Sequence, residues 1–198
     1  MVRTASTMLE LGTNAPDFAL PDTDGKLVRR DDFQDAPALL VIFMCNHCPY
    51  VKHVAPEIAK LSREYMARGV AVVGINSNDA QSHPEDGPQR MAEERAAQGY
   101  PFAYLHDASQ AVARSYRAAC TPDFFLFDGK RQLVYRGQLD DSRPKNGLPL
   151  TGSDLRAALD AVLAGRPVNH TQKPSIGCNI KWRTGEEPAY YDPAGVGS

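Results

Sequence analysis

Four consecutive residues, Cys45-Asn46-His47-Cys48, carry the clearest chemistry in this sequence. Two thiols separated by two residues can close into a disulfide and open again as a dithiol. The thiolate is the reacting form, and helix N-termini and nearby cations lower a thiol pKa from its usual value of about 8.5. We therefore predict that Cys45 is the more exposed and more acidic nucleophile and that Cys48 resolves the mixed disulfide. A protonated His47 between them would stabilise the thiolate.

The segments on either side show how this motif would be positioned. Residues 38–44 form an unbroken apolar run, which is typical of a central strand covered on both faces. Residues 48–68 have apolar side chains at helical spacing, with Pro49 where a first turn tolerates it and Gly69 after the last turn. The dithiol is therefore expected where a buried strand ends and a helix begins, and the first N–H groups of that helix favour negative charge.

The remaining pattern predicts an α/β fold, in which a central mixed β-sheet is flanked by helices on both faces. The expected elements are strands at 70–76 and 102–105 and helices at 89–98, 110–117 and 154–164. Turn residues between short apolar runs predict an N-terminal β-hairpin over 15–28 and a second hairpin over 123–136.

The two ends of the chain show little periodicity. Residues 1–12 look like a loose lead-in. We expect one domain over residues 1–165, followed by an extended C-terminal tail over residues 166–198 that packs on the domain. The last dozen or so residues of the tail are expected to be disordered.

Length, charge and hydropathy exclude several classes of protein. A chain of 198 residues is long enough for one α/β domain with a full core and short for two. Its 22 basic and 24 acidic residues give a net charge of −2, so binding to nucleic acid is not expected. No apolar run approaches the ~20 residues that cross a bilayer, and the N-terminus lacks the apolar region of a signal peptide. We expect a cytoplasmic protein, whose four cysteines suit catalysis or metal binding better than a disulfide scaffold.

A second set of motifs links the chain to a known family. The Cys-x-x-Cys after a buried strand resembles the thioredoxin-like fold, and Cys120-Thr121-Pro122-Asp123 precedes a predicted strand far downstream. Together with residues 75–79 and 177–182, these motifs resemble the peroxiredoxin-like redoxin group. That group belongs to the thioredoxin-like superfamily, as do the alkyl hydroperoxide reductase and thiol-specific antioxidant proteins. The resemblance extends over residues 11–182.

This resemblance has consequences for the site. It implies a cis peptide bond before Pro122 and a backbone at Thr121 that is offered to an extended substrate, so that both residues form a wall opposite Cys45. Typical peroxiredoxins carry Pro and Thr upstream of the first cysteine, where this chain has Ala38 and Ile42. An apolar strand cannot supply that hydroxyl to a peroxide, so efficient peroxidase activity is not expected.

Four other features have two interpretations each. Cys120 either forms an alternative disulfide with the motif or is a small buried side chain. Cys178, near the single tryptophan Trp182, is either an additional resolving thiol or part of a packed tail. Asp123 either moves a proton for the dithiol, as His47 could, or is a solvated or capping residue. The charged loop at 140–143 either lines an entrance to the site or is an ordinary solvated loop.

Three functions are compatible with these residues, and the sequence favours the first. A thiol–disulfide oxidoreductase would pass electrons between the Cys45/Cys48 dithiol and a protein disulfide or a small thiol. A thiol-dependent peroxidase would use the same thiols on a peroxide. A non-enzymatic protein would bind or deliver a soft metal such as copper through both thiols and a histidine or third thiol. The favoured function needs neither a cofactor nor a resident metal.

Overall fold

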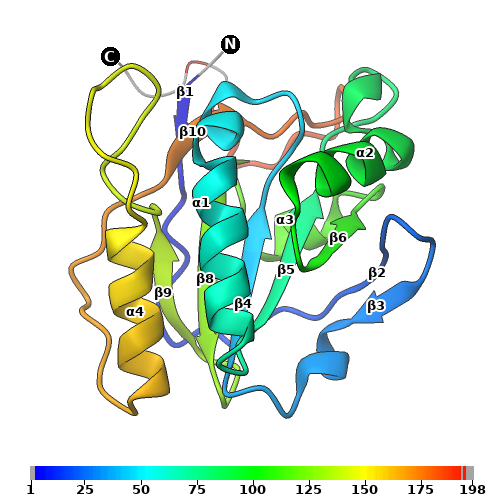
Figure 1. The fold of residues 1–198 in the computed structure, drawn as a ribbon. Helices are drawn as coiled ribbons and strands as arrows, with labels where there is room; N and C mark the ends of the chain where they lie inside the picture. The colour runs from blue at the N-terminus through cyan, green and yellow to red at the C-terminus, as the bar shows by residue number, and fades with distance from the viewer. Residues whose placement is uncertain (1–2, 193, 195–198) are drawn as a thin grey trace.

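A five-stranded mixed sheet lies at the centre of the computed structural model, which describes residues 3–192 and residue 194 (Figure 1). In spatial order its strands are β6 (Ala103–His106), β5 (Ala71–Asn76), β4 (Ala38–Phe43), β8 (Asp123–Asp128) and β9 (Leu133–Gly137). β4, β5 and β6 run parallel, whereas β8 pairs antiparallel with β4 and with β9. The apolar run at 38–44 therefore supplies the central strand, as predicted.

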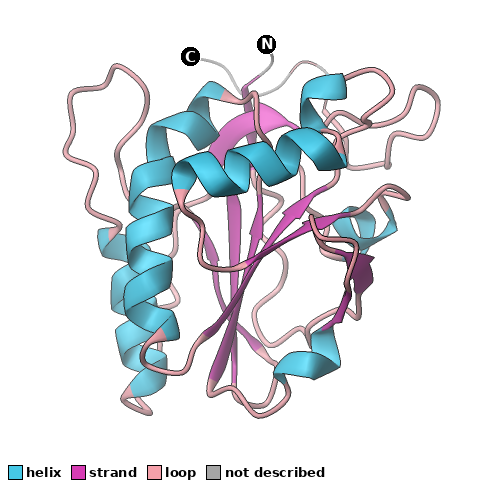
Figure 2. Ribbon diagram, turned by 45° about the vertical axis from the view of Figure 1, so that its right-hand side comes forward, coloured by secondary structure: helices cyan, strands magenta, loops and turns pink. Residues whose placement is uncertain are grey.

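Helices cover both faces of this sheet, which confirms the expected fold class (Figure 2). The α-helices are α1 (Pro49–Met66), α2 (Pro88–Gln98), α3 (Ala111–Ser115) and α4 (Ser153–Leu163). Side chains alternate along β4, so that Leu40 and Ile42 pack with α1 and α4 on one face while Val41 and Phe43 pack with α3 on the other. None of the helices in the described part of the chain is both long and apolar enough to cross a bilayer.

The start of α1 confirms the predicted arrangement of strand, motif and helix. α1 begins at Pro49 with Cys48 as its N-cap, and Cys45 follows the last residue of β4 by two positions. Pro56 lies inside the helix. Gly69 follows it with a φ of 92°, a conformation that only glycine adopts without strain.

Both predicted hairpins are present. β2 (Ala19–Pro21) pairs antiparallel with β3 (Leu27–Arg29), and the short 3-10 helix η1 (Arg30–Phe33) follows. β8 and β9 form the second hairpin. In each turn one aspartate, Asp22 or Asp128, accepts hydrogen bonds from two backbone N–H groups, which is why this residue type favours turns.

A second, three-stranded sheet lies beside the motif, with β1 and β10 next to each other in Figure 1. Its order is β1 (Arg3–Ala5), β10 (Ile176–Asn179) and β7 (Cys120–Thr121), and both pairs are antiparallel. The interpretation of residues 1–12 as a loose lead-in is therefore wrong at β1. The tail also supplies the middle strand of a sheet instead of only covering the surface. Strands of two to four residues carry too little alternation to be recognised in a sequence.

The chain after β10 packs against the α3 face of the central sheet. Ile180 and Trp182 are buried there, and the Tyr190 hydroxyl donates hydrogen bonds to backbone carbonyls at the end of α3. The expected disorder of the last dozen or so residues stays a prediction; residues 193 and 195–198 lie outside the described residues. The division of the chain at residue 165 stays a prediction.

Candidate active site

Three cysteine sulfurs from distant segments meet beyond the end of β4. Cys45 follows β4, Cys48 is the N-cap of α1, and Cys178 lies in β10. The Sγ atoms of Cys48 and Cys178 are 2.7 Å apart, and the Cys45 thiol hydrogen-bonds to Cys48. The structure therefore brings the tail cysteine into contact with the motif, which favours the interpretation of Cys178 as part of the site.

Thr121 lies against the same sulfurs. The peptide bond between Thr121 and Pro122 is cis. The Thr121 hydroxyl lies 3.3 Å from Cys45 Sγ, and the Thr121 carbonyl oxygen lies 3.3 Å from Cys48 Sγ. In the pairing of β7 with β10, Thr121 is opposite Cys178. The residue before the cis-proline thus contacts both motif thiols and pairs with the tail strand.

Cys120 adjoins this group without contacting it through its sulfur. Its Sγ lies 3.9 Å from the carbonyl oxygens of Pro122 and Ser175 and is fully buried. Successive side chains of a strand point to opposite sides, so Cys120 points away from the side on which Thr121 meets the other sulfurs. Burial raises the pKa of Cys120 well above the ordinary range of a thiol. These observations favour a small buried side chain over an alternative disulfide partner.

The expected exposure and acidity of Cys45 are wrong. Cys45 and Cys48 are 1% and 0% exposed, so neither thiol is open to solvent. The hydrogen bond to Cys48, together with burial, raises the pKa of Cys45 well above its ordinary range. Burial alone would raise the pKa of Cys48 too, but its hydrogen bonds with Cys178 and Cys45 lower it below the ordinary range. Of the two motif thiols, Cys48 rather than Cys45 is therefore the one whose pKa is shifted toward the thiolate.

The imidazole of His47 is partly buried and hydrogen-bonds to a buried carboxyl group. Its Nδ1 lies 2.6 Å from Oδ2 of Asp86, a fully buried carboxylate in the 3-10 helix η2 (Pro84–Asp86). This hydrogen bond raises the pKa of His47, although burial opposes it. Burial would raise the pKa of Asp86, but its hydrogen bonds to His47 and Asn78 lower it. The protonated imidazole expected from the sequence is thus paired with a carboxylate that the sequence analysis missed.

Asp86 is fixed by several donors besides the imidazole. The backbone N–H of Asn46 donates to Oδ1 at 2.7 Å, and the side chain of Asn78 donates to Oδ2 at 2.8 Å. The Asn46 side chain in turn donates to the Glu85 carbonyl and accepts from the Tyr104 hydroxyl. The sequence feature that could have indicated Asp86 is the polar run after β5. The carboxyl ends of the parallel strands β4 and β5 lie at the same edge of the sheet, so residues that follow β5 lie near the motif that follows β4.

One group of side chains in the described residues could hold a metal ion. Cys45, His47 and Asp86 each offer a ligand atom, and these atoms lie within 4.8 Å of one another. A metal among them would have to replace the hydrogen bond between His47 and Asp86. The soft-metal alternative therefore has suitable donor atoms but no open coordination position between them.

Asp123 is a second buried carboxyl group near the site. It is the first residue of β8, lies opposite Phe43 in the sheet, and is fully buried. Burial raises its pKa to about 7. The interpretation of Asp123 as a solvated residue is therefore wrong, and its carboxyl group titrates near neutral pH.

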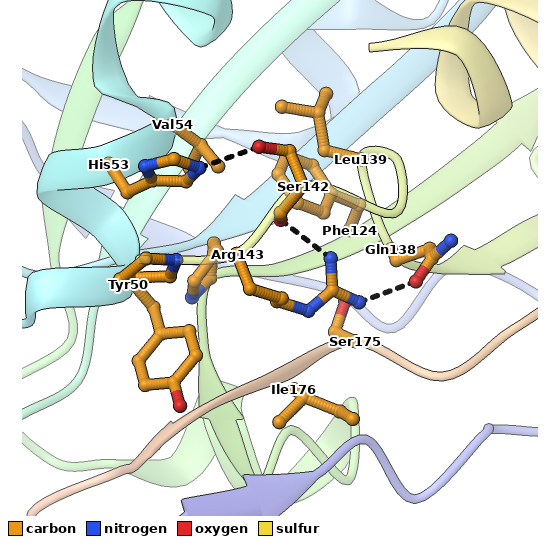
Figure 3. Close-up of a pocket in the computed structure, with 12 residues that line it drawn as sticks. Tyr50, His53, Val54, Phe124, Gln138, Leu139, Ser142, Arg143, Ser175 and Ile176 are labelled. Carbon is orange, nitrogen blue, oxygen red and sulfur yellow. Dashed lines mark hydrogen bonds between the residues drawn. The ribbon is translucent and has the colours of Figure 1, made fainter. Parts of the chain in front are cut away.

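A small half-open cavity, with about 20 Å³ of space for a water-sized molecule, adjoins the cis-proline (Figure 3). Tyr50, Pro122 and Ile176 line it on the side of the cysteines. On the opposite side lie Ser142, which hydrogen-bonds to the imidazole of His53 on α1, and Arg143. The charged loop at 140–143 thus lines an opening next to the site, the first of its two interpretations.

Comparison with known proteins agrees with this geometry. The model of the Redoxin family matches residues 10–159. The chain belongs to the Redoxin family. A putative peroxiredoxin of Mycobacterium tuberculosis is 29% identical over 115 residues, 58% of this chain and 68% of the relative. The thiol-disulfide oxidoreductase ResA of Geobacillus thermodenitrificans is 25% identical over 138 residues, 69% of this chain and 75% of the relative.

Solved structures also resemble this chain over most of its length. An uncharacterised conserved protein of Geobacillus kaustophilus is 55% identical, with a TM-score of 0.91 over 93% of this chain and 98% of that chain. The likeness to more distant solved structures, the sheet order and the cis-proline confirm the thioredoxin-like fold. The fold and the redoxin family that the motifs indicated are thus confirmed.

Proposed function

We propose that this redoxin is a thiol–disulfide oxidoreductase whose reacting sulfurs are those of Cys45, Cys48 and Cys178. The observation that carries the proposal is the contact of three sulfurs at the N-terminus of one helix, with 2.7 Å between Cys48 and Cys178. A thiol of lowered pKa in contact with two further thiols is an arrangement from which thiol–disulfide exchange can proceed. The named relatives, a peroxiredoxin and a thiol-disulfide oxidoreductase, support the same chemistry.

The hydrogen bonds assign a role to each thiol. As Cys45 Sγ attacks a substrate disulfide, the S–S bond of the substrate breaks and the Cys45 proton passes to the departing sulfur, leaving a Cys45–substrate mixed disulfide. Cys48 then attacks Cys45 Sγ, which releases the second substrate thiol and closes a Cys45–Cys48 disulfide. Cys178 can attack Cys48 in turn, which moves the disulfide to Cys48–Cys178 and returns Cys45 to its reduced form.

His47 and Asp86 support the first step electrostatically. The positive charge of His47 lies on the loop that joins the two motif cysteines, where it favours the anionic state of the dithiol. Stabilising the reduced form makes the pair a stronger oxidant. Asp86 acts as a positioning residue, because it holds the imidazole protonated without contacting the reacting sulfurs.

Single serine variants of the four cysteines test the proposal, with reduction of a disulfide substrate by dithiothreitol as the assay. We expect Cys45→Ser to lose the activity and Cys48→Ser to lose most of it. Cys120→Ser is the matched control and should keep it, because its sulfur faces backbone carbonyls. A Cys45→Ser variant as active as the parent would refute the proposal. Peptide maps of the oxidised protein should contain the Cys48–Cys178 linkage.

A peroxidase is the second candidate, favoured by one specific contact. Residues 38–44 offer no hydroxyl, but the Thr121 hydroxyl lies 3.3 Å from Cys45 Sγ and could contact a peroxide there. The test is consumption of hydrogen peroxide with a thiol donor. Thr121→Val should lower that rate more than it lowers disulfide reduction. A parent rate no greater than that of a free thiol would remove this candidate.

We also propose that the protein acts in the reducing cytoplasm, on a thiol, disulfide or peroxide substrate. Only four cysteines in 198 residues, three of them at one site, support a catalytic use over a structural one. Fractionation of cells that produce the full-length chain tests the compartment. Recovery with secreted or envelope proteins would contradict it.

A further inference from the structure

The strand β10 covers the sulfurs of the site. It pairs with β7 so that Cys178 lies opposite Thr121, the residue whose hydroxyl and carbonyl face the motif thiols. With β10 in place, Cys45, Cys48 and Cys178 are all buried. The other edge of β10 is occupied by β1. Beside the dithiol, therefore, the edge of β7 is already filled by a segment of the same chain.

The residues after β10 hold this strand in place. The N–H of Ile180 donates to the Ala119 carbonyl, and the N–H of Lys181 donates to the side chain of Asn78. Ile180 and Trp182 are buried against the α3 face. Release of β10 would expose both side chains and break both strand pairs, so we do not expect the strand to leave in each catalytic cycle.

Gly177 makes this close packing possible. A Cβ atom added there would lie 1.9 Å from the Thr121 carbonyl oxygen, far closer than two such atoms can approach. The obstacle is backbone and cannot rotate away. Any side chain at this position must therefore displace β10 from β7.

These contacts limit what can reach the sulfurs. An extended polypeptide docks to a protein by adding a strand to a vacant sheet edge, and β10 already fills the edge beside the dithiol. A small molecule needs no strand edge. The cavity of Figure 3 offers an approach, because its lining residues Tyr50, Pro122 and Ile176 lie within two positions of Cys48, Thr121 and Cys178, although those three residues do not themselves line it.

The cavity also carries a positive charge. The Arg143 guanidinium donates hydrogen bonds to the Asp140 and Ser142 carbonyls and to the Gln138 side chain, and the last two of these are drawn in Figure 3. Asp141, whose pKa Arg143 helps to lower, is not one of the residues that line the cavity, and no acidic side chain is among the described residues that do. A carboxylate on the ligand would accept a charge-assisted hydrogen bond from Arg143.

We propose that this site acts on a low-molecular-weight disulfide that carries a carboxylate and excludes disulfides of folded or extended polypeptides. The inference rests on the proposed function and names its substrate class. In the reaction, one small disulfide and the Cys45/Cys48 dithiol give two small thiols and the Cys45–Cys48 disulfide, with both protons passing to the released thiols. Gly177 is the residue that determines this specificity through the position of β10.

The first test compares substrates on the wild-type protein. Dithiothreitol reduces insulin or hydroxyethyl disulfide with and without the protein, and each rate is expressed as acceleration over dithiothreitol alone. We expect acceleration for hydroxyethyl disulfide and none for insulin. Equal or greater acceleration for insulin would overturn the inference while leaving the proposed function intact. Acceleration of neither substrate would instead overturn the proposed function.

The second test displaces the strand. Gly177→Ala should loosen β10, seen as faster hydrogen exchange of its amides, and should raise insulin acceleration relative to hydroxyethyl disulfide by about tenfold or more. Cys120→Ser changes a buried side chain of the neighbouring strand β7 outside the reacting sulfurs and should leave this ratio unchanged. A loosened β10 without any gain on insulin would overturn the inference. If Gly177→Ala does not fold, the wild-type comparison still decides.

The third test concerns charge. Arg143→Gln should raise KM for dithiodipropionate, an anionic disulfide, by about tenfold, the loss expected for one charge-assisted hydrogen bond. KM for the neutral hydroxyethyl disulfide should not change. Lys145→Gln removes the same charge from an exposed position of the same loop and is the matched control. Equal effects of Arg143→Gln on both substrates, or equal effects of both variants, would overturn the role of the cavity.

Discussion

At the scale of single residues, the site depends on buried groups whose pKa values move in opposite directions. The pKa of Cys48 is lowered, whereas hydrogen bonds with Cys48 and burial raise the pKa values of Cys45 and Cys178. The hydrogen bond to Asp86 raises the pKa of His47. Cys48 is therefore shifted toward its negatively charged form and His47 toward its positively charged form.

Asp86→Asn tests the ion pair with His47. The pKa of His47 is raised above 6.5, so its contribution to stability is fully present below pH 6.5 and is lost as pH rises through the raised value. We expect the variant to lose about 3 kcal/mol of unfolding free energy at pH 6, because a buried charged partner is removed. The deficit should shrink at higher pH in urea denaturation. A deficit independent of pH would show a purely structural role.

Asp123→Asn tests the second buried carboxyl group. Its pKa is raised from 3.8 to about 7 in the folded state, so the folded protein binds a proton more tightly than the unfolded chain. The contribution of Asp123 therefore lowers the unfolding free energy of the wild type as pH rises from about 4 to 7. We expect the variant to be more stable than wild type at pH 8 by about 2–4 kcal/mol, with little difference at pH 4. Equal stability at pH 8 would contradict the raised pKa.

At the scale of elements, the site is a meeting of three chain segments. β4 and α1 present the two motif cysteines, β7 presents Thr121, and β10 brings the tail thiol between β1 and β7. Of these elements, only β4 and α1 follow each other in the sequence. The position of β10 therefore depends on the packing of the residues that follow it.

Trp182→Ala tests that packing. The indole is buried on the α3 face, and the Arg114 guanidinium lies 5.3 Å from the ring centre. We expect a loss of about 3–5 kcal/mol in unfolding free energy, as for other buried aromatic side chains. The variant should also form the Cys48–Cys178 disulfide more slowly, because β10 is less firmly held. Leu148→Ala, at an exposed position, is the control and should change neither quantity.

At the scale of the whole molecule, the two possible disulfides differ in the loop that they close. Cys45 and Cys48 are three residues apart, whereas Cys48 and Cys178 are 130 residues apart and join the helix to the tail. Cross-linking stabilises a fold mainly by restricting the unfolded chain, and more so for longer loops. The free energy of unfolding of the oxidised protein therefore depends on which of the two disulfides forms.

Urea denaturation of oxidised and reduced variants separates the two pairs. Oxidised Cys45→Ser, which keeps only the long pair at the site, should be more stable than its reduced form by about 5 kcal/mol. Oxidised Cys178→Ser, which keeps only the short pair, should gain about 2 kcal/mol at most. A gain in Cys45→Ser no larger than in Cys178→Ser would mean that the long disulfide is strained or does not form.

The sequence by itself determined the features that local pattern controls. The apolar run at 38–44, the proline and glycine at the ends of α1, and the aspartates in both hairpins fix elements through neighbours a few residues away. The Cys-x-x-Cys motif identified the chemistry for the same reason. The resemblance to the thioredoxin-like fold also predicted that Pro122 lies across from the dithiol.

Only the tertiary structure decided which thiol is acidic, which carboxylate holds His47 and what covers the sulfurs. Asp86 lies 39 residues from His47, and Cys178 lies 130 residues from Cys48, in segments too short to show a period. Their contacts arise from the pairing of β1, β10 and β7 and from the shared edge of the parallel strands. The pKa of each thiol and its access to substrate depend on burial and on side chains that are near in space but distant in the sequence, so the sequence pattern alone does not reveal them.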